Sequence, residues 1–294
     1  MKYFLKEAPL VFTVIHLEFS QNPMLSNMSD ELSKSLHQSM IEKGFPEKIV
    51  SKQQVVEVVI GLDKQPVQQA SIIHRTLFRA PGEQEIVQIS DNAIILKSTC
   101  YDSFEAFYEK FKSILETCVN VVPSFEKVLL KRVKLRYVDV IAPGKNDTLG
   151  DFVSNEILPM SLSMLDGISQ RQGLTVTRAM TGEARFLQVN FEELHCNEGK
   201  VHKVLPDNLI ETDPQCGLRI DGHKRWLSLT SETYGILDID HQHSFTGSPT
   251  FNLSFLEEKL QNLYEYSSKV FWETISQKAK DTWGIQEKAA EVKS

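Results

Sequence analysis

The chain has 294 residues, of which 41% are hydrophobic and 24% are charged, so its composition is that of a globular protein and excludes fibrous and disordered classes. Its 32 Lys and Arg against 39 Asp and Glu give a formal net charge of -7, which leaves no overall positive field to attract nucleic acid or an anionic membrane. Because no window approaches the ~18 apolar residues of a membrane helix and the four cysteines lack the close spacing of a disulfide framework, we expect a cytoplasmic protein with no membrane partner.

The first half of the chain alternates predicted strands and helices. Alternating apolar residues predict a strand over 11–19, and apolar residues at every fourth position predict a helix over 28–44. Further β-rich runs cover 55–62 and 70–79, and two short strands joined by Ser90, Asp91 and Asn92 predict a hairpin over 85–97. An aromatic-rich helix over 102–118 and a long strand over 125–141 complete this half.

The second half begins after a polar loop that starts at Pro143 and Gly144. Its predicted elements are a short helix after Thr148, strands over 174–180, 185–191, 226–229 and 235–239, a polar segment over 195–217, and a long C-terminal helix from Ser254. The loop therefore predicts two α+β units, residues 1–143 and residues 148–294.

This order of elements predicts an α+β fold with two antiparallel or mixed sheets, each covered by helices. Residues 85–115 and 226–275 share a strand-turn-strand-helix order, which is typical of a duplicated unit. A chance recurrence of this common arrangement is the alternative.

The long strand carries the candidate binding residues. Side chains alternate along a strand, so Arg132, Lys134 and Arg136 share one face at intervals of ~6.5–7 Å. Such a row can bind phosphates or a carboxylate-rich partner, and Tyr137 is adjacent for stacking at an edge. The alternative interpretation is a solvated face whose cations pair with acidic neighbours.

Two pairs near the end of the chain have metal-ligand spacing. His241 and His243 share one strand face, and Asp238 and Asp240 share the other. Because the pairs face apart and neither has a third ligand, we predict no metal and no cofactor, although the sequence leaves binding at either pair open. No common catalytic motif is present, so we predict no catalytic residues, and the question of enzymatic activity stays open.

The segment from Lys131 to Asp139 resembles the Arg-Ile-Gly-Leu-Arg-Tyr-Ile-Asn-like strand of a sporadically distributed family of uncharacterised bacterial and archaeal proteins. Arg132, Leu135, Arg136 and Tyr137 match this motif, whereas Lys134 replaces the usual Gly and Asp139 the usual Asn. The resemblance implies a cytosolic α+β protein of prokaryotic type. Its patchy distribution implies an accessory role, such as immunity or conflict.

Taken together, these features favour non-catalytic recognition of a macromolecule, with another protein as the expected partner. Nucleic acid is disfavoured by the net charge. The alternatives are a nucleic-acid-processing or other phosphate-handling enzyme that uses the basic strand, and a small-ligand binder. The sequence leaves the partner, the oligomeric state and the pathway open.

Overall fold

The computed structural model describes residues 3–59, 67–144, 146–162, 164, 166–167, 170–227, 229 and 231–287, without the side chains of 53–59, 67–73 and 224–225. Residues 60–62, predicted as the end of a strand, lie outside the described residues. The described chain forms an α+β fold, as predicted from the sequence.

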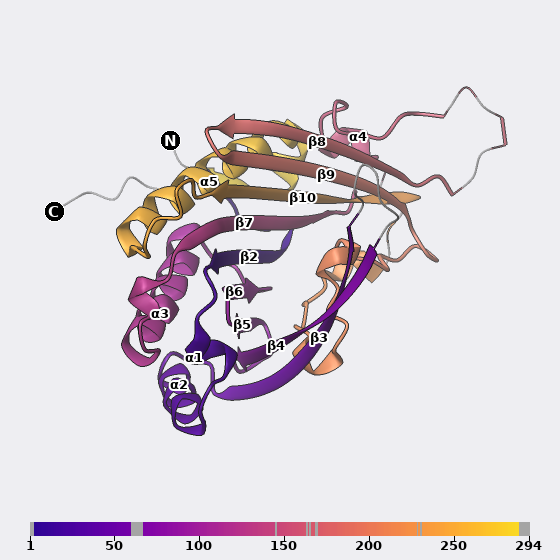
Figure 1. The fold of residues 1–294 in the computed structure, drawn as a ribbon. Coiled ribbons are helices and arrows are strands. Elements are labelled where there is room, and N and C mark those ends of the chain that lie inside the picture. Colours follow the sequence, from indigo (N-terminus) through magenta and orange to yellow (C-terminus); the bar gives the residue numbers. More distant parts are fainter. Residues whose placement is uncertain are drawn as a thin grey trace.

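Nine of the described strands form one antiparallel sheet in the order β3-β4-β5-β6-β2-β7-β10-β9-β8 (Figure 1). Their bounds are β2 Leu10–Phe19, β3 Glu47–Val59, β4 Val67–Arg79, β5 Glu85–Ile89, β6 Ala93–Ser98, β7 Leu130–Ile141, β8 Gly173–Gly182, β9 Arg185–His195 and β10 Thr233–Ser244. The terminal strands β1 Tyr3–Leu5 and β11 Ile285–Glu287 pair in a separate two-stranded sheet.

The sheet is continuous across the two predicted units, so the prediction of a separate sheet in each half differs from the structure. Strand β7 of the first half pairs with β10 of the second half, from Arg132 opposite Ser244 to Ile141 opposite Gly235. Alternation identifies a strand, but it does not identify the distant strand with which it pairs. Whether 1–143 and 148–294 behave as separate units stays a prediction.

Six α-helices are present in the described chain: α1 Pro23–Ser26, α2 Asp30–Glu42, α3 Phe104–Val121, α4 Leu149–Phe152, α5 Leu253–Thr274 and α6 Gln277–Thr282. The predicted C-terminal helix is interrupted at Ile275, which forms an isolated bridge with Val153, and Ser276 then caps α6. The side chain of Asn252, and not Ser254 as predicted, caps the start of α5.

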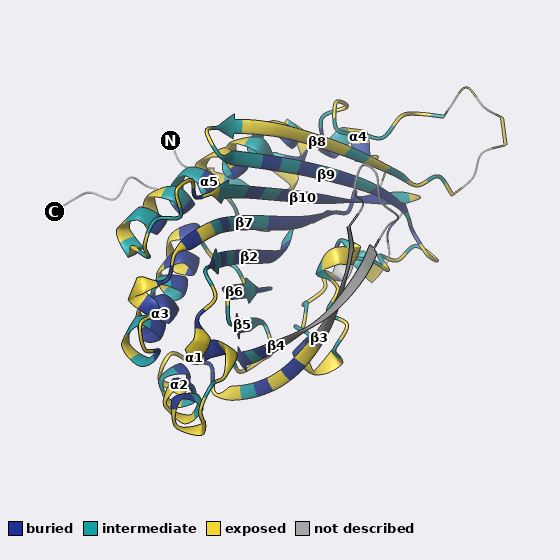
Figure 2. Cartoon of the chain, in the orientation of Figure 1, coloured by how far each residue is buried: buried dark blue, intermediate teal, exposed yellow. Residues whose placement is uncertain are grey.

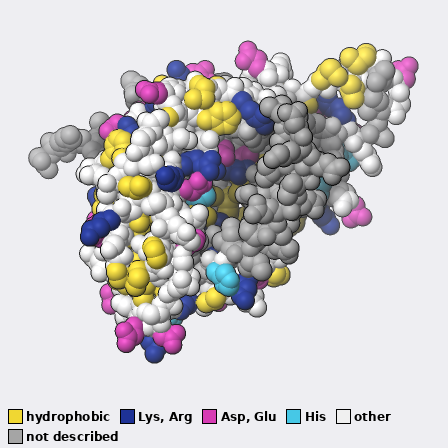
Figure 3. Space-filling view, in the orientation of Figure 1, with side chains coloured by type: hydrophobic (Ala, Val, Ile, Leu, Met, Phe, Trp, Pro, Cys, Tyr) yellow, Lys and Arg dark blue, Asp and Glu magenta, His cyan; other side chains and the backbone are white. Residues whose placement is uncertain are grey.

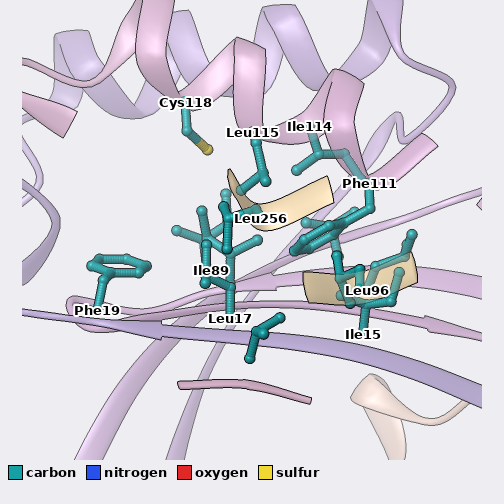
Figure 4. Packing of buried hydrophobic residues seen from close by; sticks show 14 of the residues in the cluster. Ile15, Leu17, Phe19, Ile89, Leu96, Phe111, Ile114, Leu115, Cys118 and Leu256 are labelled. Carbon is teal, nitrogen blue, oxygen red and sulfur yellow. The ribbon is translucent and has the colours of Figure 1, made fainter. Parts of the chain in front are cut away.

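Helices α2, α3 and α5 pack against one face of the sheet through a large apolar cluster. Figure 4 shows Phe111, Ile114 and Leu115 of α3 directed onto the strand residues below them. Helix α5 lies against β7 and β10 together, so it holds the strands of the two halves in one layer.

The opposite face, which we call the inner face, is partly covered by the chain between β9 and β10. This crossing segment, residues 196–232 as far as they are described, lies inside the curve of the sheet (Figure 1). It contains the short turns η2 Asp207–Leu209, η3 Pro214–Cys216 and η4 Lys224–Leu227. Because η4 includes residues 226 and 227, the prediction of a strand over 226–229 is wrong at its start. The second copy of the proposed repeat therefore does not have the strand-turn-strand order that was predicted for it.

Candidate functional site

A pocket of about 240 Å³ lies on the inner face, between the sheet and the crossing segment. Strand side chains form its floor and residues 208–211 form one wall. Its lining from the described residues is Val14, His16, Arg75, Gln88, Ile95, Lys97, Lys134, Arg136, Asn208, Leu209, Ile210, Glu211 and Asp240. Figure 3 shows Lys and Arg side chains gathered beside acidic side chains near the middle of the visible face.

The predicted cation row of β7 lies on this inner face. Its residues are opposite those of β2, with Glu18 across from Arg132, His16 across from Lys134 and Val14 across from Arg136. The intervening residues Val133 and Leu135 are buried in the helix-side cluster. Of the three cations, Lys134 and Arg136 line the pocket, and Arg132 lies beyond its edge.

Both arginines of the row are held by carboxylates. The guanidinium of Arg136 donates two hydrogen bonds to Asp238, at 2.7 and 2.8 Å. Arg132 donates to Glu18 at 2.7 and 3.0 Å. The Asp238 side chain is only 1% exposed, so its pair with Arg136 is a buried structural element. The alternative interpretation of paired cations therefore fits the two arginines.

The two lysines of the pocket are held more loosely. Lys134 Nζ lies 4.0 Å from Glu18, and Lys97 Nζ lies 3.9 Å from Glu211. These separations exceed hydrogen-bond length, and neither ammonium has another hydrogen bond to a described residue. An ammonium carries three donors. Lys97 and Lys134 therefore retain donors that can bind an acceptor entering the pocket.

Two further lining groups have unsatisfied polar atoms. Arg75 donates to Glu211 through both terminal nitrogens, at 2.9 and 2.7 Å, but its Nε has no partner among the described residues. Asp240 has a buried Oδ1 that also lacks a described partner. Buried polar atoms are normally hydrogen-bonded, so these two atoms are exceptions among the described residues.

Cationic side chains outnumber acidic ones in the described lining of the pocket, and Asp238 and Glu18 lie beside two of these cations. Burial, together with the cations Lys134, Arg132 and Lys97, lowers the pKa of His16 to about 4 against the opposing effect of Glu18, so its imidazole is neutral. Burial raises the pKa of Asp240 and lowers the pKa of Lys97. The described lining thus contains four cationic side chains and two acidic ones, Glu211 and Asp240.

The structure separates Tyr137 from the three cations with which it was grouped. Its ring is 9% exposed on the helix side of the sheet, and its hydroxyl lies 3.3 Å from that of Tyr101. Burial raises the pKa of Tyr137 well above its usual value. The ring is therefore part of the core beneath α3.

One residue of each candidate metal pair is held by structural contacts. His241 is buried, with Nε2 2.7 Å from the Thr181 hydroxyl and Nδ1 3.1 Å from the Leu263 carbonyl of α5. Asp238 accepts hydrogen bonds from Arg136 and from Asn190. Among the described residues, no group of three or more His, Cys, Asp or Glu side chains is arranged to hold a metal ion.

Sequence reasoning missed His16, Arg75 and Lys97 as parts of this site. A usable signal was present: His16 and Lys97 are polar residues at inner-face positions of otherwise apolar strands. The pattern of polar and apolar residues within a strand does not specify which strands are its neighbours. The convergence of β2, β4, β6 and β7 on one pocket was therefore not predictable.

None of the described helices is long and apolar enough to cross a membrane. Comparisons of the chain with protein-family models and with curated proteins found no match.

Proposed function

We propose that the protein acts by recognition, and that its inner-face pocket receives a carboxylate of an acidic protein partner. The observation that carries this proposal is the convergence of unsatisfied donors on one pocket. The ammonium groups of Lys97 and Lys134 are available there. A carboxylate supplies acceptors for these donors and offsets their repulsion.

Charge and size favour a protein partner over the two alternatives. A nucleic-acid strand would meet inner-face arginines that are already bound to Glu18 and Asp238. The pocket volume of about 240 Å³ lies below the roughly 300–1,000 Å³ typical of small-molecule sites. A single acidic side chain of a larger partner fits this volume.

Titration with a fluorescent oligoglutamate peptide, followed by anisotropy, tests the proposal. We expect saturable binding that weakens steeply as salt is raised. Lys97→Gln and Lys134→Gln each remove one charged donor at nearly constant length, so each should reduce affinity by roughly tenfold or more.

The control is Lys131→Gln, because Lys131 is an exposed lysine of β7 that does not line the pocket. It should leave affinity unchanged within about twofold. An equal loss in all three variants, or tighter binding of single-stranded DNA than of the peptide, would contradict the proposal. Tighter binding of inorganic phosphate than of the peptide would instead favour the small-ligand alternative.

A further inference from the structure

Strand β8 forms one end of the nine-stranded sheet and pairs only with β9 among the described strands. Ten residues long, it contains no Pro and no Lys, and Arg178 is its one charged residue. Natural edge strands are usually short or are protected by such residues, because free backbone groups along an edge can pair with another strand. Figure 2 shows β8 largely exposed, in contrast to β10 and β7.

The exposed side chains of β8 are largely apolar. Leu174 is 62% exposed, Val176 43% and Met180 65%. All three stand on the inner face, because each lies directly opposite a β9 residue of that face. These β9 residues are Glu192, Asn190 and Phe186. An apolar row beside an open strand edge is typical of an interaction surface.

From these observations we infer that two copies of the chain associate by antiparallel pairing of β8 with β8. The complement of an unpaired strand edge is another extended strand. Antiparallel pairing about a twofold axis presents the same surface from both copies, so the edge must be complementary to itself.

The sequence of β8 meets this requirement when the axis passes through Thr177. Leu174 then lies opposite Met180 of the second copy, twice, which buries four exposed apolar side chains against one another. Thr177 lies opposite Thr177, and Val176 lies opposite Arg178. Both inner faces remain on the same side, so the dimer presents two pockets on one continuous surface.

The register provides a charge-specific test on the full-length chain by sedimentation velocity over a wide concentration range. The wild type should reach twice the chain mass of 33.5 kDa. Val176→Lys places a lysine opposite Arg178 of the other copy at two positions and should weaken the dimer by at least about tenfold. Val176→Glu places a carboxylate there and should retain the dimer.

The matched control is Val50→Lys, because Val50 is an exposed valine, 67% accessible, on β3 at the opposite edge of the sheet. It should leave the dimer intact. Circular dichroism melts establish that each variant is folded. A wild type that stays monomeric at the highest concentration would overturn the inference, as would equal effects of Val176→Lys and Val176→Glu, or of Val176→Lys and Val50→Lys. Peptide binding in the pocket is measured separately, so either proposal can fail alone.

Discussion

Replacing Arg136 with alanine is expected to lower the free energy of unfolding by about 3–5 kcal/mol. The change removes the guanidinium that satisfies Asp238, whose carboxylate is buried at 1% exposure. The cost comes mainly from leaving this carboxylate without a counter-ion. Urea denaturation measures the loss, and adding Asp238→Asn to the Arg136→Ala protein should recover part of it.

Lys134→Ala is the matched control on the same strand face. The Lys134 side chain is 26% exposed and lies 4.0 Å from its nearest carboxylate, so its removal should change stability by less than about 1 kcal/mol. Equal losses in the two variants, or further destabilisation by Asp238→Asn, would contradict the assignment of Arg136 to the fold. The distinction also decides which variants can test binding: Lys97 and Lys134 are suitable, and Arg136 is not.

Replacing Asp139 with asparagine should stabilise the protein at alkaline pH. Burial, with the nearby charge of Asp238, raises the pKa of Asp139 from 3.8 to about 8. The native protein therefore holds a proton that the unfolded chain releases, so this group lowers stability progressively as pH rises from about 4 to about 8. Asparagine is neutral throughout. We expect a gain of about 2–4 kcal/mol at pH 8 and little change at pH 5, after allowing for the cost of burying an amide.

Denaturant unfolding at the two pH values measures this difference, with Asp166→Asn as the control. Asp166 is exposed, so its replacement should have no effect at either pH. If the stability difference between Asp139→Asn and the wild type does not grow between pH 5 and pH 8, Asp139 is not held neutral in the native protein.

The local features of the fold were predictable because they depend on residues close in sequence. The apolar spacing of Leu32, Leu36 and Met40 identified α2, and the alternation of β7 put Arg132, Lys134 and Arg136 on one face. The hairpin at Ser90 was also predicted, and its backbone closes on Ala93.

The features that depend on distant pairing were not predictable. Arg75 meets Glu211 across 136 residues, and Arg136 meets Asp238 across 102 residues. Hydrophobic patterns specify which face of a strand is buried, but they do not specify its neighbours. The predicted cation row was therefore only part of the site. The structure divides it into arginines bound to carboxylates and a lysine that remains available.

Native mass spectrometry of the protein purified from its own host tests the central claim most directly. The wild type should carry a second protein whose release increases with ionic strength, and the folded Lys97→Gln/Lys134→Gln variant should emerge without it. The same protein bound equally to both forms would contradict recognition through the inner-face pocket, as would a nucleic acid bound in its place.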